Sequence, residues 1–310
     1  PDTLKKFILD RILSLYHPRN GFKAGLPWFS ERWFRDELLS LLFINKDIKD
    51  KDLIIQFYLD NLENIWNKNK ISASMLTADT FLLIVSNLEE NIIEKHKNVL
   101  KNFLGEWEKL FNTNNLPPKA TWMDTLNRPK AIEIDLLYYN ALRKLKFLEK
   151  SKEFKMLLKS SIFLKSYPQK ELYSPNLFLG YFLVKDFFEE YEWFSFFDTI
   201  IQNFYLKWGG FASVSIDDLN FKKYHTGEDP TSYHSGDSWF WVNNLGAYVL
   251  RTLSYKKYEE YIEKIKEASF KNLLTMGVLG YMSELSSAEE LRYEGCPIQL
   301  WSLASLYLLL

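Results

Sequence analysis

Carboxylate and aromatic residues occur together in four short segments of the sequence. The segments span residues 26–36, 121–124, 224–241 and 283–301. Flat apolar rings stack on pyranose sugars, and carboxylates accept hydrogen bonds from hydroxyl groups. Two carboxyl groups can also supply the acid and the base of glycoside hydrolysis. The four segments are therefore typical of the wall of a sugar-binding site.

Several of these residues also have purely structural interpretations. Asp36, Glu37 and Asp79 could stabilise the N-termini of helices. Asp237 could cap a helix that begins near Trp239. The Trp residues could fill the core, because a large helical protein buries many aromatic side chains. The pattern alone leaves both interpretations open.

A metal site is the main alternative chemistry. His225 and His234 lie near two carboxylates, Asp229 and Asp237. Their spacing does not place two histidines on one helix face, as zinc hydrolases require. The stretch 216–237 is rich in carboxylates but lacks the regular alternation and the Gly of a calcium-binding loop. We therefore expect no metal and no cofactor.

Helices must position these segments, because apolar residues recur at helical spacing through most of the chain. Gly and Pro are scarce, at 12 and 10 residues, which argues against a sandwich or barrel of strands. Weak alternation over residues 211–216 is the only strand signal. The pattern predicts an all-α chain of twelve helices, near residues 3–16, 34–44, 50–67, 77–88, 91–111, 132–148, 150–164, 176–188, 191–206, 238–253, 257–274 and 297–309.

The longer loops recur with a period of about two helices. They fall near residues 25, 72, 122, 171, 222 and 287. Six helical hairpins can stack as an open solenoid or close into a ring with an inner and an outer layer. In a closed ring the loops would converge at one end and form one deep pit. No low-complexity linker divides the chain, so we expect one domain over residues 1–310.

Composition limits the classes of partner. The formal net charge is -1 from 39 basic and 40 acidic residues, so no basic field attracts nucleic acid or an anionic membrane. Residues 1–16 carry charges throughout, unlike a signal peptide, and a cytoplasmic location is expected. The single Cys296 excludes an intramolecular disulfide and is typical of a small buried apolar residue. The oligomeric state is not predictable from the sequence.

Five motifs occur in order from Gly25 to the C-terminus. They are Pro27, Trp28 and Phe29 with Trp33, Phe34, Arg35 and Asp36; Thr121, Trp122, Met123 and Asp124; Ile132, Glu133 and Ile134 with Tyr139, Asn140, Ala141 and Leu142; Tyr233, His234, Gly236, Trp239 and Trp241; and Ser283, Glu284, Gly295, Cys296, Gln299, Trp301 and Ser302. In this order they resemble the amylo-α-1,6-glucosidase domain of glycogen debranching enzymes.

The resemblance implies an (α/α)6 barrel, in agreement with the independent count of six hairpins. It also implies an inverting, exo-acting glycoside hydrolase that removes α-1,6-linked glucose from a branched α-glucan or oligosaccharide. Asp124 would be the general acid that protonates the leaving oxygen, and Glu284 the general base that activates water. The implied substrate-binding residues are Trp28, Trp33, Arg35, Asp36, Trp122, Glu133, His234 and Trp239.

The sequence departs from the family pattern at three places. One extra residue precedes Trp33, the loop from Asp124 to Glu133 is short, and residues 285–293 replace an acidic, proline-rich stretch. These departures alter the leaving-group side of the site. Two alternatives stay open: a barrel that acts on trehalose, isomaltose-type chains or another α-glucoside, and a non-catalytic glycan-binding protein.

Overall fold

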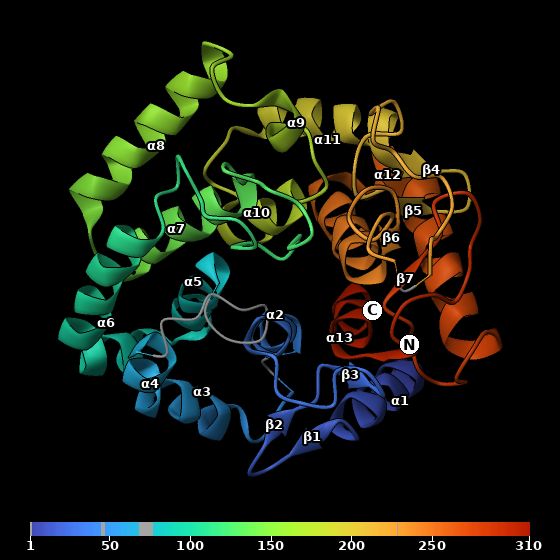
Figure 1. The fold of residues 1–310 in the computed structure, drawn as a ribbon, viewed down its shortest axis with the longest axis horizontal. Helices are drawn as coiled ribbons and strands as arrows, with labels where there is room; N and C mark the ends of the chain where they lie inside the picture. Colours follow the sequence, from blue (N-terminus) through green and yellow to red (C-terminus); the bar gives the residue numbers. More distant parts are fainter. Residues whose placement is uncertain (1, 45–46, 68–76, 228) are drawn as a thin grey trace.

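The computed structural model describes residues 2–44, 47–67, 77–227 and 229–310 (Figure 1). Its helices are α1 (Asp2–Leu13), α2 (Phe34–Ile44), α3 (Lys51–Asp60), α4 (Leu62–Asn67), α5 (Ala78–Asn87), α6 (Glu90–Leu110), α7 (Ile132–Lys144), α8 (Leu148–Phe163), α9 (Gln169–Leu172), α10 (Leu177–Val184), α11 (Glu190–Phe204), α12 (Phe240–Thr275) and α13 (Leu300–Leu309). The long loop expected near residue 72 lies outside the described residues.

Six of these helices form a closed inner ring. Each helix contacts the next in the order α2, α5, α7, α10, α12 and α13, and α13 contacts α2 to close the ring. Figure 1 shows α1, α3, α4, α6, α8 and α11 around the outside of this ring. The predicted all-α fold and its (α/α)6 barrel are therefore confirmed, and the closed ring replaces the solenoid alternative.

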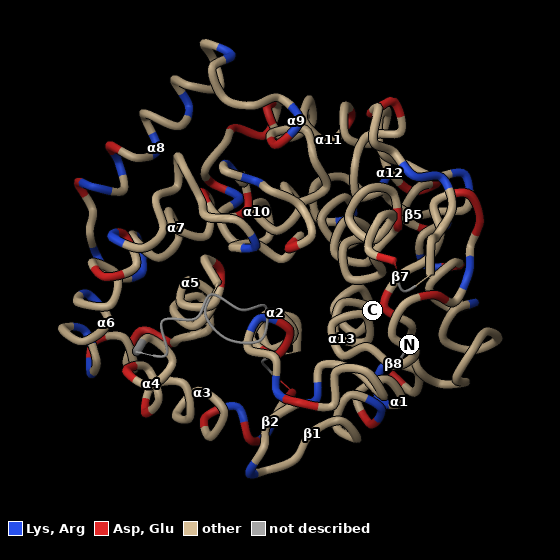
Figure 2. The backbone as a smooth tube through the Cα atoms, in the orientation of Figure 1, with Lys and Arg blue, Asp and Glu red and all other residues tan. Residues whose placement is uncertain are grey.

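The two layers follow from the distribution of apolar residues. The inner α10 has the sequence LFLGYFLV and is buried on nearly every face, whereas the outer α6 buries only one stripe, including Leu100, Leu104 and Trp107. Figure 2 shows the charged residues of both signs concentrated on outer helices such as α6 and α8. Gly180 allows α10 to lie close to α7, because a Cβ atom there would meet the side chain of Leu136.

Helix boundaries differ from the prediction at three points. The helix expected over 50–67 divides at Asn61 into α3 and α4, and the short α9 was not expected. The two helices expected over 238–253 and 257–274 run on as α12, with a break at Ser254, whose φ and ψ are -164° and 96°. The two predicted helices are therefore separated by a kink and not by a loop.

The described residues form four antiparallel pairs of strands, and each strand is two residues long. They are β1 (Tyr16–His17) with β2 (Gly21–Phe22), β3 (Gly25–Leu26) with β8 (Ile298–Gln299), β4 (Tyr205–Leu206) with β5 (Gly210–Phe211), and β6 (Ser238–Trp239) with β7 (Leu285–Ser286). The strand signal over 211–216 was too long, since only Phe211 of that stretch is in β5. Two pairs join loops that are distant in sequence: β3 with β8, and β6 with β7.

The inner helices all begin at one end of the barrel, because the chain alternates between the inner and outer layers. The first turn of α2, the N-cap of α12 at Trp239 and the N-cap of α13 at Gln299 therefore lie at the same end. The loops that precede these helices carry the motifs. Within the described ranges, no helix combines the length and apolar character needed to cross a lipid bilayer.

Candidate active site

A pocket of about 170 Å³ lies at the end of the barrel where the inner helices begin. The four carboxylate and aromatic segments of the sequence all contribute to it. Its lining residues are Phe29, Trp33, Arg35, Asp36, Trp122, Asp124, Tyr233, His234, Trp239, Glu284, Gln299 and Trp301. The structure thus brings together Asp124 and Glu284, which are far apart in the sequence.

Glu284 is buried and held at both carboxylate oxygens. The Tyr233 hydroxyl donates to Oε1, and the Cys296 backbone N–H donates to Oε2 at 3.0 Å. Burial raises the pKa of Glu284 to about 7, although these two hydrogen bonds favour the ionised form and lower it. Glu284 is therefore poised to exchange a proton near neutral pH.

Asp124 has a different environment in the same pocket. Its side chain is 24% exposed, and Oδ2 lies 3.7 Å from Arg35 Nη1. Burial raises the pKa of Asp124, while the nearby Arg35 guanidinium opposes the shift. The direction agrees with the expected acid, which must keep its proton until it meets the leaving oxygen.

Arg35 and Asp36 project from the first turn of α2 into the pocket. Arg35 Nε donates to Asp79 Oδ2 at 2.7 Å, which fixes the guanidinium. Gln299 Nε2 donates to Asp36 Oδ1 at 3.3 Å. Burial raises the pKa of Asp36 to about 8. Asp79 lies in the first turn of α5, as expected, but its carboxylate also acts as the anchor of Arg35.

Aromatic rings form one wall of the pocket. The His234 ring stacks on Trp239 with a centroid distance of 5.0 Å and an interplanar angle of 4°. Trp122 meets Trp239 edge to face at 5.2 Å. Burial holds the pKa of His234 well below its usual range, so the imidazole is neutral. The wall therefore consists of apolar and neutral ring faces.

Four buried polar atoms of the lining residues have no hydrogen-bond partner within the described part of the chain. They are Arg35 Nη2, His234 Nε2, Gln299 Oε1 and Trp301 Nε1. Buried polar groups are normally paired, so unpaired groups around a cavity indicate a polar ligand. A sugar, whose hydroxyls both donate and accept, would satisfy this mixed set.

Two predicted substrate-binding residues do not line the pocket. Trp28 is 52% exposed and lies outside the lining. Glu133 is 2% exposed, and both of its oxygens accept from Arg128, at 2.6 and 3.0 Å. The structure therefore places neither side chain in the pocket: Glu133 holds Arg128, and Trp28 is exposed to solvent, so their contact with substrate stays a prediction. The other eight predicted site residues line the pocket.

Sequence reasoning missed several members of the lining. Phe29, Tyr233, Gln299 and Trp301 belong to the quoted motifs but were not singled out as site residues. The signal that identifies Tyr233 is its hydrogen bond to Glu284, which joins two loops and is invisible in the sequence. Cys296 is fully buried with its pKa raised to about 11, which confirms the apolar interpretation.

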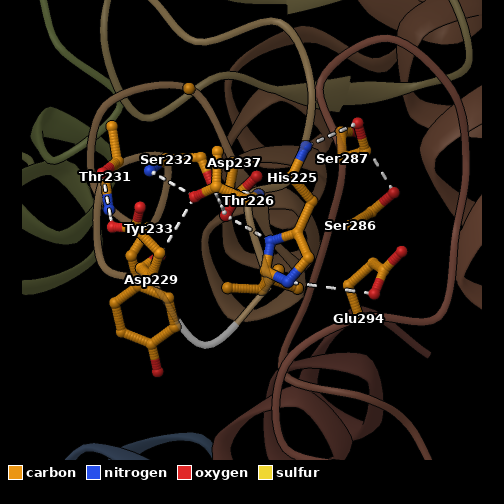
Figure 3. Close-up of polar contacts among 12 residues, drawn as sticks. His225, Thr226, Asp229, Thr231, Ser232, Tyr233, Asp237, Ser286, Ser287 and Glu294 are labelled. Atoms are coloured by element: carbon orange, nitrogen blue, oxygen red, sulfur yellow. Dashed lines mark hydrogen bonds and ion pairs between the residues drawn. The ribbon is translucent and has the colours of Figure 1, made fainter.

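A polar network joins the loop of Tyr233 to the loop of Glu284 (Figure 3). His225 Nδ1 lies 2.7 Å from Asp237 Oδ2, and the Ser232 hydroxyl donates to the same oxygen at 2.8 Å. His225 Nε2 lies 3.8 Å from Glu294 Oε2. Asp237 is therefore a partner of His225. Of the two interpretations left open for Asp237, the N-cap is wrong, because Trp239 occupies the N-cap of α12.

This arrangement separates the histidines that a metal site would need. His225 joins the network, whereas His234 Nδ1 lies 2.7 Å from the hydroxyl of Thr125 in the pocket wall. Among the residues that the structure describes, no group of three or more His, Cys, Asp or Glu side chains is arranged to hold a metal ion.

Comparison with known proteins gives matches to one family and to one fold. Residues 160–308 match the family described as Amylo-alpha-1,6-glucosidase. No curated protein matches the chain. The GH63 mannosylglycerate hydrolase from Thermus thermophilus, solved with Tris and D-glycerate, superposes with a TM-score of 0.63 at 12% identity, covering 98% of this chain and 99% of that one.

Two further solved structures show how widely the fold is used. A glycosidase variant in complex with glucose has a TM-score of 0.63 at 9% identity and covers 99% of this chain and 95% of its own. A D-mannose isomerase has a TM-score of 0.53 at 13% identity, with 99% and 97% covered. Because an isomerase shares it, the fold alone does not fix the reaction. The family match and the fold together support a glycoside hydrolase. The chain thus matches the amylo-α-1,6-glucosidase family over residues 160–308 and has the (α/α)6 fold of solved glycosidases.

Proposed function

We propose that the protein is an inverting, exo-acting glycoside hydrolase that removes α-1,6-linked glucose from branched α-glucans. The observation that carries the proposal is the presence of Asp124 and Glu284 in one pocket with stacked aromatic rings and unpaired hydrogen-bonding atoms. The family match over residues 160–308 favours the α-1,6 linkage.

In the proposed reaction the two carboxyl groups act on opposite faces of the sugar. Protonated Asp124 gives its proton to the leaving O6 atom as the glycosidic bond breaks. Ionised Glu284 takes a proton from the water that attacks the anomeric carbon. The Tyr233 hydroxyl and the Cys296 N–H hold the Glu284 carboxylate in a fixed orientation for that water.

After one turnover each carboxyl group has the protonation state opposite to the one it needs for the next. Glu284 holds the proton from water, and Asp124 is ionised beside Arg35. Asp124 is the more exposed of the two, so it can regain a proton from solvent directly. The buried Glu284 has a pKa of about 7, which favours release of its proton near neutral pH.

The size of the pocket supports removal of one glucose at a time. Its volume of about 170 Å³ is below the ~300 Å³ at which pockets begin to hold drug-sized ligands. One sugar ring at a chain end fits this scale better than an internal stretch of polysaccharide. Arg35 and Asp36 are placed at the barrel wall to hold hydroxyls of that terminal ring.

The test is glucose release from a cyclodextrin bearing one α-1,6-linked glucosyl stub, with the anomer followed by proton NMR. An inverting enzyme releases β-glucose first. Release of α-glucose would instead indicate retention and would remove Glu284 from the role of base. The Glu284→Gln variant is the control, since it keeps the shape of the side chain and cannot accept the proton.

A second candidate keeps the mechanism and changes the substrate. The mannosylglycerate hydrolase and this chain superpose over nearly their whole lengths. A small α-glycoside with a short leaving group therefore belongs in the assay. A panel of mannosylglycerate, trehalose and isomaltose separates these substrates from the glucan. If the wild-type protein binds glucan but hydrolyses none of these substrates, the non-catalytic alternative holds. The Asp124→Asn variant then has no turnover to abolish.

A further inference from the structure

His225 lies where the loop of Tyr233 meets the loop of Glu284 (Figure 3). Its side chain is 10% exposed, and it is not among the residues that line the catalytic pocket. The imidazole Nδ1 lies 2.7 Å from Asp237 Oδ2, and Nε2 lies 3.8 Å from Glu294 Oε2. The imidazole therefore bridges a carboxylate of its own loop and a carboxylate of the loop that carries Glu284.

The first of these carboxylates holds the backbone next to Tyr233. The Ser232 hydroxyl donates to Asp237 Oδ2 at 2.8 Å, and the Asp237 backbone N–H donates to the Ser232 carbonyl at 3.0 Å. Thr226, which follows His225, donates its backbone N–H to the Ser232 hydroxyl at 2.9 Å. Ser232 directly precedes Tyr233, so these contacts fix the point from which the Tyr233 hydroxyl reaches Glu284.

The second carboxylate belongs to the segment that holds the other oxygen of Glu284. The Glu294 N–H donates to the Leu285 carbonyl at 3.1 Å, and the Leu285 N–H donates to the Glu294 carbonyl at 3.2 Å. Two residues further on, the Cys296 N–H donates to Glu284 Oε2 at 3.0 Å. Both hydrogen bonds to the Glu284 carboxylate therefore come from segments that His225 connects.

The groups that face His225 favour its charged form. The hydrogen bond to Asp237 raises the pKa of His225, and the charges of Glu294 and Glu284 act in the same direction against the effect of burial. An imidazolium donates from both ring nitrogens, as a bridge between two carboxylates requires. The geometry and the surrounding charge thus agree on a protonated His225.

The charge of His225 also acts on the base. It lowers the pKa of Glu284, whereas the Asp124 carboxylate raises it. The buried Asp36 lies close enough to Glu284 for the two carboxyl groups to repel each other when both are ionised. His225 therefore offsets part of the repulsion that an ionised Glu284 meets from the other carboxylates of the site.

We propose that His225 is a positioning residue for the general base, which holds the loops of Tyr233 and Glu284 together and stabilises the ionised Glu284 carboxylate. The inference rests on the proposed hydrolysis, in which Glu284 accepts a proton from water, and it names the group that prepares the base for that step. Because His225 does not line the pocket, its loss should affect kcat and leave KM for the sugar nearly unchanged.

The first experiment measures the pH profile of His225→Gln with α-glucosyl fluoride between pH 5 and pH 9. Without the positive charge, the acidic limb of kcat/KM should move to higher pH by about half a unit or more. The kcat at pH 7 should fall about tenfold, with KM near that of the wild type. His225→Lys keeps a positive charge, so its limb should lie closer to that of the wild type. An unmoved limb in His225→Gln, or a loss confined to KM, would overturn the proposal.

Glu289→Gln is the matched control for a contact between the same two loops. It breaks the ion pair of Glu289 with Lys223, at 3.0 Å, in which both side chains are largely exposed. Exposed pairs contribute little, so kcat and the acidic limb should stay those of the wild type. A shift as large as that of His225→Gln would show that any weakened contact between the loops has this effect, and it would contradict the proposal.

A titration by NMR separates failure of this inference from failure of the proposed function. The Glu284 carboxyl carbon is followed in protein labelled with 13C-glutamate, and Glu284→Gln assigns its signal. Glu284 should titrate at higher pH in His225→Gln than in the wild type, by about half a unit or more, even if no substrate is hydrolysed. Equal titration in the two proteins overturns the inference even if glucose is released from the branched substrate.

The wild type alone decides the question if the His225 variants do not fold. Two groups that interact titrate in coupled steps, so the His225 ring signals should show a second inflection at the pH where Glu284 ionises. Glu284→Gln should remove that inflection. A single His225 titration that is the same in the wild type and in Glu284→Gln would overturn the proposal.

Discussion

At the scale of single residues, Asp124 and Glu284 differ in what surrounds them. Glu284 accepts two hydrogen bonds and is buried, whereas Asp124 lies beside a guanidinium and keeps a partly exposed edge. Both pKa values are raised, with burial as the main cause in each case. The proposed division of roles therefore rests on the different hydrogen bonds and solvent access of the two groups, because burial shifts both pKa values in the same direction.

The pH dependence of activity follows from the Glu284 carboxyl. A general base must be ionised, so kcat/KM should fall about tenfold per pH unit below the pKa of about 7. The measurement is kcat/KM for α-glucosyl fluoride from pH 5 to pH 9. An acidic limb near the ordinary pKa of a glutamate would contradict the raised pKa of Glu284.

Tyr233→Phe tests the hydrogen bond to that carboxylate. The Tyr233 hydroxyl lowers the pKa of Glu284, so its removal should move the acidic limb of the profile to higher pH. The rate at the optimum should fall by about tenfold or more, because the carboxylate also loses its fixed orientation. A lower rate with an unmoved limb would mean that Tyr233 acts on the substrate and leaves the Glu284 pKa alone.

At the scale of elements, short contacts between loops hold the site together. The pair β6–β7 joins Trp239 to Leu285, directly beside Glu284. His225 ties the same two loops at a second point, through its contacts with Ser287 and Glu294. Neither contact involves residues close in sequence, so neither could be predicted from helical periodicity.

Asp237→Asn should destabilise the protein in a pH-dependent way. The Asp237 carboxylate raises the pKa of His225, so their attraction is fully present below the ordinary histidine pKa of about 6.5 and is lost as pH rises through the raised value. The loss in free energy of unfolding should be about 1–3 kcal/mol near pH 6 and smaller near pH 9. Thermal unfolding at both pH values measures it, with His225→Gln as the matched change. An equal loss at both pH values would argue against a charged His225.

Glu133→Gln distinguishes a structural role from the substrate contact expected from the sequence. Arg128 would keep Glu171 as its one carboxylate partner and lose one charge-assisted hydrogen bond, which should cost about 1–3 kcal/mol of stability. The KM of the folded variant for α-glucosyl fluoride should stay near that of the wild type. A large rise in KM with unchanged thermal stability would restore the direct role.

Positions within motifs were harder to predict than the motifs themselves. The sequence placed Trp28, Trp33, Arg35 and Asp36 in one segment, but only the structure shows that Trp28 turns to solvent while the others face the pocket. Spacing identifies a loop, and it does not determine which side chains of that loop point inward. For Glu133 the deciding partner, Arg128, lies five residues earlier and had no role in the motif.

At the scale of the whole molecule, the barrel was predictable because its layers differ in composition. The inner helices α10 and α13 carry no charged residue, the outer α6 has one apolar stripe, and long loops follow every second helix. The break at Asn61 and the short α9 were not predictable, because they depend on how the outer layer packs on the ring.

The buried carboxyl groups should make the stability of the whole protein fall as pH rises. Burial raises the pKa of Asp36 to about 8, of Glu284 to about 7 and of Asp135 to about 6. The folded state therefore keeps protons that the unfolded chain has released, and stability declines from about pH 4 to about pH 8. Asp36→Asn removes the largest of these penalties, so its Tm should exceed that of the wild type by about 2 °C or more at pH 9 and by less at pH 5. A Tm difference that is the same at both pH values would be inconsistent with a protonated Asp36.

Closure of the ring also has a consequence for synthesis on the ribosome. The last inner helix, α13, contacts both α2 and α12, and β8 pairs with β3 near the other end of the chain. At about 5–20 residues per second, α2 waits on the order of tens of seconds for this partner to be translated. During that interval the faces of α2 and α5 that will line the ring are open to water and to other nascent chains. We expect the growing polypeptide to depend on chaperones until α13 has left the exit tunnel, and Gln299 and Trp301 complete the pocket only at that moment.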